Sequence, residues 1–353
     1  MVVIPPDVSI ITVGGPAAPE KARFPMPATH TIGIDLGGTN IKAGVVDADG
    51  RPLVRRSIPT QSEGGPEHVI ARLAQLTQDL IHAARLARSD VQAVGLGAPG
   101  PMSHKLGIIY ACPNLPGWKD VPLRARLHDA SGLPVALEND ANAAAFGEFV
   151  AGAGRGTRDL VLLTLGTGIG GGVIMDGRLQ RGAFDNAGEV GHMIVVPDGR
   201  PCPCGQRGCL ERYSSANAVA ERLIEAVQAG EDSILRTNVG AGAHVTSSDV
   251  AQAARNGDAL ATRVWDEMCR YLAVGCVNLQ HLLNPERIVL GGGLIGAGPQ
   301  LFDAVRAHFE RLTWRIARDQ PTILPATLGD DGGVIGAAAL ARIECVQQAA
   351  KRA

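Results

Sequence analysis

Two glycine- and threonine-rich stretches of this chain share one local plan, and that plan limits the folds open to it. The first runs Leu36-Gly-Gly-Thr-Asn-Ile-Lys-Ala-Gly-Val-Val-Asp-Ala-Asp-Gly-Arg51, and the second runs Leu165-Gly-Thr-Gly-Ile-Gly-Gly-Gly-Val-Ile-Met-Asp-Gly-Arg178. Each pattern indicates a strand that enters a tight Gly/Thr turn, a second strand, and an Asp-Gly hairpin turn. The duplication predicts an α/β chain of two similar lobes that face a central cleft.

The segments that follow the two stretches extend the duplication. After the first, Pro66 and apolar residues at helical spacing (Val69, Leu73, Leu76, Leu80) predict a helix, and residues 91–95 predict a strand that ends in glycine. After the second, residues 259–283 predict a long helix, and residues 287–290 predict a strand that leads into Gly291-Gly-Gly293. Each half is therefore expected to end on a helix, a strand and glycines.

Composition bounds the domain plan. A chain of 353 residues with 45% hydrophobic residues can bury two cores. We expect a flexible, Pro-rich extension over residues 1–30, with an edge strand near 8–13, and a small lobe over 31–140. We expect a large lobe over 141–330 and a C-terminal helix over 331–353 that packs back on the small lobe.

Charge and hydropathy exclude several classes of partner. The net charge is −2, so there is no basic footprint for nucleic acid, and no apolar run has the length of a membrane span. Residues 1–30 lack the basic start and continuous apolar core of a signal peptide. These features, with seven cysteines in no secretory framework, predict a cytoplasmic protein.

The two glycine turns are candidate phosphate sites. Neither is a P-loop, because no Gly-Lys-Ser/Thr follows, and neither is a dinucleotide-binding turn, because a strand follows each one. A Gly/Thr hairpin offers backbone N–H groups and a hydroxyl, which together can bind an anion. Asp35, at a strand end, could hold Mg²⁺ through water. The alternative is a pair of ordinary hairpins.

A metal-ligand pattern follows the second stretch. His192, Cys202, Cys204 and Cys209 form a Cys3His set that suits tetrahedral Zn²⁺. Reduced free thiols are the alternative, since a disulfide is disfavoured without a secretory context. Glu189 and Glu211 bracket the set, so a metal there could order a loop that presents acids.

Two further segments carry candidate polar groups. In Glu138-Asn-Asp-Ala-Asn142, Asp140 is expected at a strand-to-helix corner, in the N-cap position. It is either a simple capping residue or a general base held on rigid elements. Asn114, in the turn Pro113-Asn-Leu-Pro-Gly-Trp118, could read a sugar hydroxyl, although such a turn is weak evidence by itself.

Together these motifs resemble the ROK family of bacterial sugar kinases, repressors and related proteins, over residues 31 to 343. The segments that carry the resemblance are Asp35-Leu-Gly-Gly-Thr-Asn40, Glu138-Asn-Asp-Ala-Asn142, Leu165-Gly-Thr-Gly-Ile-Gly-Gly171, Gly188-Glu-Val-Gly-His192 and Cys202-x-Cys-Gly-x-x-Gly-Cys-x-Glu211. The resemblance implies the duplicated actin/hexokinase-like (ribonuclease H-like) fold, with a zinc-binding loop and two lobes that close over ATP and a sugar.

The resemblance also implies a role for each matching residue. Asp140 matches the catalytic base. The other roles fall into a hexose-reading set (Asn114, Asn139, Glu189, His192, Glu211), a structural zinc set (His192, Cys202, Cys204, Cys209), and nucleotide segments (Asp35, Gly37, Gly38, Thr39 and Lys42; Gly166, Thr167, Gly168 and Gly170; Gly291, Gly292 and Gly293). His192 would bind zinc with one nitrogen and a sugar hydroxyl with the other. Residues 330–336 would lie near the hinge.

The expected function is ATP- and Mg²⁺-dependent phosphorylation of the 6-hydroxyl of a hexose, most directly glucose, by a homodimer or other homo-oligomer. The alternatives are a kinase of N-acetylglucosamine or N-acetylmannosamine, a fructokinase or a mannokinase. A repressor is disfavoured, because thirty Pro-rich residues do not suit a helix-turn-helix module. A sugar-binding regulator without catalysis is the alternative from another class. No role is assigned to residues 1–30 or to the Gly/Ala-rich stretch 230–244.

Overall fold

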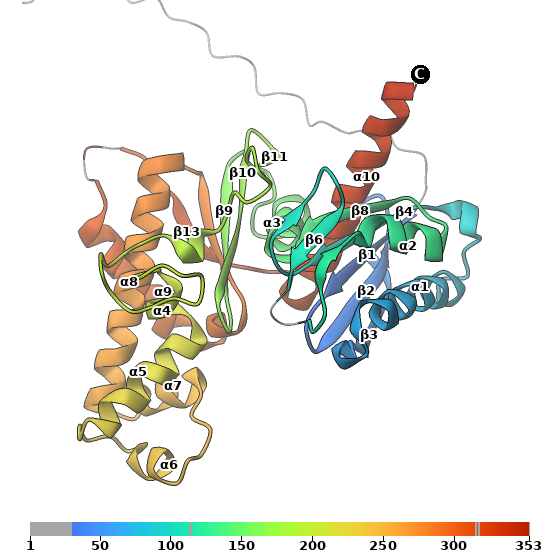
Figure 1. Cartoon of the computed structure of the whole chain (residues 1–353). Helices are drawn as coiled ribbons and strands as arrows, with labels where there is room; N and C mark the ends of the chain where they lie inside the picture. Colours follow the sequence, from blue (N-terminus) through green and yellow to red (C-terminus); the bar gives the residue numbers. More distant parts are fainter. Residues whose placement is uncertain (1–29, 113–114, 315, 317, 353) are drawn as a thin grey trace, which may run out of the picture.

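Two five-stranded sheets organise the computed structural model, which describes residues 30–112, 115–314, 316 and 318–352 (Figure 1). The first sheet has the order β3-β2-β1-β4-β8 and the second has the order β11-β10-β9-β12-β13. Their strands are β1 (His30–Leu36), β2 (Asn40–Val46), β3 (Pro52–Pro59), β4 (Val91–Ala98), β8 (Val135–Asn139), β9 (Leu160–Leu165), β10 (Ile169–Met175), β11 (Arg178–Leu179), β12 (Arg287–Gly291) and β13 (Thr322–Pro325).

The two sheets have the same topology. In each, an antiparallel meander supplies the first three strands in sequence, and two parallel strands are then added beside the first of them. The predicted duplicated fold is therefore confirmed, since the two sheets repeat both strand order and direction.

Helices cover the outer face of the first sheet. These are α1 (Gly65–Ala83) and α2 (Leu123–Ser131). The predicted helical spacing is confirmed, because Val69, Leu73, Leu76 and Leu80 all lie in the core that α1 shares with β1, β2 and β4. A small sheet of β5 (Met102–Ser103), β6 (Ile108–Ala111) and β7 (Lys119–Val121) lies beside them.

A larger helical layer packs on the second sheet (Figure 1). It consists of α4 (Glu211–Ser214), α5 (Ala216–Gln228), α6 (Arg236–Gly240), α7 (Ser247–Arg255), α8 (Ala259–Leu283) and α9 (Pro299–Leu312). The bounds of α8 are those predicted from its apolar spacing, and the stretch 230–244 contains the short helix α6. Short 3-10 helices span Ser62–Gly64, Arg88–Asp90, Val190–His192, Gly293–Ala297 and Gly329–Asp331.

Two helices, α3 (Asp140–Ala151) and α10 (Gly332–Arg352), lie between the sheets (Figure 1). Phe146 of α3 and Leu340 of α10 share an apolar core with Leu162 and Val289 of the second sheet, while α10 also packs along β1 and β4. The helices cross so closely at Gly336 that a Cβ there would overlap the carbonyl oxygen of Ala143. The backbone contact fixes the start of α3 relative to both sheets.

None of the helices in the described part of the chain has the length and apolar character that a membrane crossing requires. Residues 1–29 of the expected Pro-rich extension, the edge strand expected near 8–13, and Asn114 lie outside the described residues, while His30, expected in that extension, begins β1.

Candidate functional site

The site is centred on the corner at which β8 ends and α3 begins. The prediction that Asp140 is the N-cap is wrong: Asn139 is the cap, and its side-chain oxygen accepts hydrogen bonds from the backbone N–H groups of Ala141 (3.0 Å) and Asn142 (3.1 Å). Asp140 is the first helical residue, and its Oδ1 accepts from Ala141 N–H at 2.8 Å. Its Oδ2 has no hydrogen-bond partner in another described residue.

A second carboxylate lies near Asp140. Asp35 is the next-to-last residue of β1. Because β1 pairs in parallel with β4, and β4 with β8, Asp35 and the corner lie at the same carboxyl-terminal edge of the sheet. Burial raises the pKa of Asp35 to about 6, and the neighbouring charges of Asp140 and Asp330 add to the rise while Lys42 opposes it. Burial likewise raises the pKa of Asp140. Two carboxylates of raised pKa at one strand edge are typical of a functional site.

The first hairpin, residues 36–41 between β1 and β2, is closed by a hydrogen bond from Gly37 N–H to the carbonyl of Asn40 (3.0 Å). Thr39, at its tip, is exposed. Lys42, expected to reach a phosphate, forms an ion pair with Asp330 at 2.6 Å. The residues just before α10 therefore contact the strand that follows the first hairpin.

The second hairpin, residues 165–169 between β9 and β10, forms a hydrogen bond with a side chain from a distant segment of the chain. Gly166 N–H bonds the carbonyl of Gly168 (3.0 Å), and Ile169 N–H donates to Glu211 Oε2 (2.8 Å). Gly170 lies against Ala141 of α3, and Gly292 lies against the backbone of Leu165. The structure thus brings the corner, the second hairpin and the 291–293 glycines together.

The predicted metal ligands converge. One ligand atom from each of His192, Cys202, Cys204 and Cys209 lies within 4.8 Å of all the others. Cys204 Sγ and Cys209 Sγ are 3.7 Å apart, and Cys202 Sγ is 3.7 Å from His192 Nδ1. A tetrahedral metal with bonds of about 2.3 Å to sulfur places two sulfurs about 3.7 Å apart. The cluster therefore fits zinc in both donor type and spacing.

The predicted sugar-reading acids lie beside this Cys3His cluster. Partial desolvation raises the pKa of Glu189; the charge of His192 opposes the rise, while Asp140 and Glu211 reinforce it. These four groups are therefore close enough to interact electrostatically, and His192 Nδ1 faces the thiols, leaving Nε2 for another partner. The structure therefore brings Glu189, His192 and Glu211 together beside Asp140.

A buried polar network behind the corner was not predicted from the sequence. Glu138 is 4% exposed, and it accepts from Asn139 N–H, from Asn142 Nδ2 (both 3.0 Å) and from Arg181 Nε (2.6 Å). Arg181 follows β11 of the second sheet, so this ion pair joins the two sheets. The one signal in the sequence was an acidic residue inside an apolar strand.

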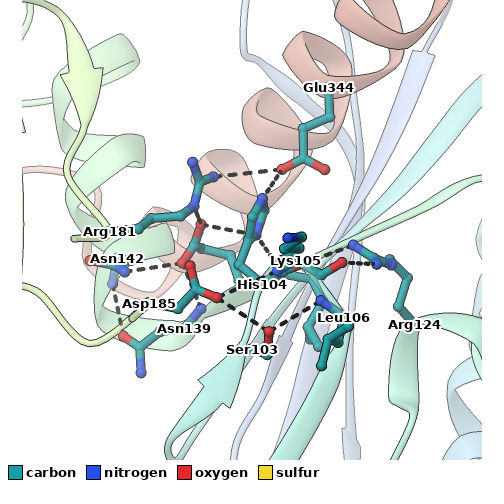
Figure 2. Close-up of polar contacts among 12 residues, drawn as sticks. Ser103, His104, Lys105, Leu106, Arg124, Asn139, Asn142, Arg181, Asp185 and Glu344 are labelled. Carbon is teal, nitrogen blue, oxygen red and sulfur yellow. Dashed lines mark hydrogen bonds and ion pairs between the residues drawn. The ribbon is translucent and has the colours of Figure 1, made fainter. Parts of the chain in front are cut away.

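Further partners complete that network (Figure 2). Arg181 is 3.6 Å from Glu344 of α10, and His104 Nε2 is 3.2 Å from the same carboxylate. His104 Nδ1 also lies 2.9 Å from the carbonyl oxygen of Leu137. The network therefore connects the strand before Asp140 with α10 and with the segment that leads to Glu189.

Comparison with known proteins agrees with this geometry. The model of the ROK family matches residues 31–344. A glucokinase of Halalkalibacterium halodurans is 39% identical over 86% of this chain and 92% of its own. The crystal structure of a ROK hexokinase from Thermus thermophilus has a TM-score of 0.77 at 35% identity, over 90% of this chain and 100% of that one. A ROK family glucokinase from Streptomyces griseus, in complex with glucose and AMPPNP, has a TM-score of 0.72 at 37% identity, over 89% and 99%. The chain belongs to the ROK family.

Proposed function

We propose that this protein is an ATP-dependent hexose kinase that phosphorylates the 6-hydroxyl of glucose. The observation that carries the proposal is the position of Asp140: its carboxylate stands at a rigid corner near Asp35, just before the first hairpin, and α3 packs on β10, just after the second hairpin. The glucokinase relatives support glucose as the acceptor.

In the proposed reaction, Asp140 is the general base. Its Oδ2 accepts the proton of the 6-hydroxyl while the hydroxyl oxygen bonds to the γ-phosphorus of ATP and the bond to the β-phosphate oxygen breaks, releasing ADP. A pKa raised by burial makes Asp140 a stronger proton acceptor once it is ionised. The hydrogen bond from Ala141 N–H holds the carboxylate in a fixed orientation.

The two hairpins and the 291–293 glycines are proposed to bind ATP. Thr39 and Thr167 are exposed at the two turns, where hydroxyl and backbone N–H groups can bind phosphate oxygens. Asp35 supplies the hard oxygen ligand that Mg²⁺ prefers, in this case through water. Magnesium, when bound, neutralises charge on the transferred phosphoryl group.

The sugar is proposed to contact Asn114, Asn139, Glu189, His192 and Glu211. The Nδ2 group of Asn139 has no partner among the described residues, and His192 Nε2 points away from the thiols because Nδ1 faces them. The zinc proposed for the Cys3His cluster is structural. With four protein ligands it has no open position, so it serves to order the loop and to fix the orientation of His192.

A coupled ADP-release assay with ATP and Mg²⁺ tests the proposal across glucose, N-acetylglucosamine, N-acetylmannosamine, mannose and fructose. Preference for glucose is expected. Preference for another sugar would preserve the kinase mechanism and change the substrate. Absence of turnover with every sugar, in protein whose zinc content has been verified, would instead favour a sugar-binding regulator.

We also propose that the protein works as a homodimer in a reducing, cytoplasmic compartment. Among the described residues, Cys202, Cys204, Cys209, Cys269, Cys276 and Cys345 form no disulfide, which suits such a compartment. The mass of the native protein, measured by light scattering, tests the oligomeric state.

A further inference from the structure

Glu211 contacts the second hairpin as well as lying among the proposed sugar ligands. It is the first residue of α4, two positions after Cys209, and its Oε2 accepts the N–H of Ile169 at 2.8 Å. The same oxygen occupies the space beside Gly168, where a Cβ would overlap it. The hairpin and this carboxylate therefore fit each other closely, although 42 positions separate Glu211 from Ile169.

This contact leaves the outer face of the turn available. Gly166 N–H closes the turn on Gly168, and Ile169 N–H goes to Glu211. Within the described residues, the N–H groups of Thr167 and Gly168 donate to no acceptor, so they remain available to a phosphate. A second bond, from Ala216 N–H to the carbonyl of Gly166 (2.9 Å), attaches the start of α5 to the same turn.

We propose that Glu211 is a nucleotide-positioning residue: by holding Ile169 N–H it sets the shape in which the second hairpin receives the phosphates of ATP. The inference rests on the proposed kinase function. It adds to the role of Glu211 in sugar binding, because Oε2 serves the hairpin while Oε1 remains for a sugar hydroxyl. One rigid carboxylate then serves both substrates.

A coupling between the substrates follows. If glucose bound at Oε1 restrains the carboxylate, it also restrains the hairpin, so glucose should strengthen nucleotide binding, and by reciprocity the nucleotide should strengthen glucose binding by the same factor. An opposing effect is electrostatic, because a carboxylate near phosphates repels them. Three substitutions separate these effects. Glu211→Ala removes acceptor and charge, Glu211→Gln keeps an acceptor without the charge, and Glu211→Asp keeps the charge on a shorter side chain.

The test is the dissociation constant of magnesium-AMPPNP, measured by calorimetry without sugar. We expect Glu211→Ala and Glu211→Asp to weaken binding about 10-fold or more, within the range of a charge-assisted hydrogen bond, and Glu211→Gln to stay within about 3-fold of the wild type. Asp129→Ala is the control, since Asp129 is an exposed carboxylate of α2 outside the proposed binding residues; it should leave nucleotide binding unchanged.

The outcomes are distinguishable. Wild-type nucleotide affinity in both Glu211→Ala and Glu211→Asp would overturn the inference. Binding by Glu211→Gln that is tighter than wild type by more than about 3-fold would also overturn it, because electrostatic repulsion would then dominate. If Glu211→Ala loses zinc or its folded circular dichroism signal, Glu211→Asp decides, because it preserves the carboxylate at the start of α4. A wild-type protein that binds glucose but no AMPPNP would instead contradict the proposed kinase function itself.

Discussion

The two hairpins occupy equivalent positions in the two sheets, yet different polar contacts stabilise them. The first carries its own charged residues, Asp35 just before it and Lys42 just after it, and Lys42 pairs with an Asp330 side chain that is 86% exposed. The second has no charged residue over residues 165–170, and Glu211 reaches it from another segment.

The difference teaches what duplication preserves. Strand order and direction are repeated, because they set the core. The fastening is not repeated. An exposed ion pair contributes about 0–1 kcal/mol, whereas a hydrogen bond to a charged group contributes about 1.5–3 kcal/mol. The first hairpin also accepts two neutral hydrogen bonds from Thr60, from its hydroxyl to the carbonyl of Gly37 (2.7 Å) and from its N–H to the carbonyl of Thr39 (2.8 Å). The two hairpins therefore differ in their charged contacts, and we expect the charged contact of the second hairpin to be the stronger.

The largest effect is expected at the corner that serves both hairpins. Asp140→Asn removes the proposed base and preserves the shape of the side chain, so kcat should fall by about 10²–10⁴-fold while the dissociation constant of glucose stays nearly unchanged. Steady-state kinetics and calorimetry check the two quantities separately. A kcat near that of the wild type would show that Asp140 is not the general base, so the corner near both hairpins would lack a catalytic role.

The next largest effect is expected from loss of the zinc ligand Cys204, because the zinc loop carries Glu211, which contacts the second hairpin. Cys204→Ala should lower zinc content and weaken glucose binding by about 10–100-fold, with a smaller loss of folded structure, because the cluster orders the loop around Glu189 and Glu211. Elemental analysis, calorimetry and circular dichroism measure the three quantities. Cys345→Ala, outside the cluster, is the control. Global unfolding of Cys204→Ala, or full activity without zinc, would contradict the structural role.

A third prediction concerns the first hairpin and its pH dependence. An acid whose pKa rises on folding, as that of Asp35 does from 3.8 to about 6, stabilises the folded state only while protonated. That contribution is present below about pH 4, declines up to about pH 6 and is absent above it. Asp35→Asn, neutral throughout, should therefore raise the free energy of unfolding above pH 6 by at most about 3 kcal/mol.

Urea unfolding in magnesium-free buffer at both ends of this pH range measures the effect. Asp129→Asn, which replaces an exposed carboxylate, serves as the control and should show little pH-dependent difference from the wild type. If Asp35→Asn is no more stable than the wild type above pH 6, ionisation of Asp35 does not destabilise the folded protein, and the prediction is wrong.

The smallest effect is expected from the exposed ion pair. Asp330→Asn should change the free energy of unfolding by less than about 1 kcal/mol, since both charges are partly solvated. Nucleotide affinity should rise a few-fold, because Lys42 is released toward the phosphates. Asp331→Asn, which breaks the neighbouring pair with Arg55, is the control for charge alone. A stability loss above about 2 kcal/mol would make the first hairpin as firmly fastened as the second.

Much of this arrangement follows from local sequence pattern. The apolar spacing predicts α1 and the full extent of α8, and the ligand spacing predicts the Cys3His cluster. The cap at the corner could not be assigned to the correct residue, since Asn139 and Asp140 are both favourable capping types. The choice depends on where β8 stops, which is set by the pairing of Asn139 with Ala98.

Long-range polar contacts also could not be predicted from the sequence. Glu138 finds Arg181, and Glu211 finds Ile169, across 43 and 42 positions respectively. No periodicity encodes such a contact, because it depends on how the two sheets are set against each other. The sequence places Glu138 in a buried strand and Glu211 two positions after Cys209, but it does not reveal the partner of either carboxylate.

The crossing of α3 and α10 at Gly336 has a consequence for how this chain can change. No atom lies between the two helix backbones at that point, so their separation is at its lower limit and any added side chain forces them apart. Asp140 stands at the start of one of these helices and Asp330 just before the other. A single methyl group nearly two hundred positions away in the chain would therefore reset the geometry of the reaction, and mutational tolerance at this glycine should be as narrow as at the proposed base itself.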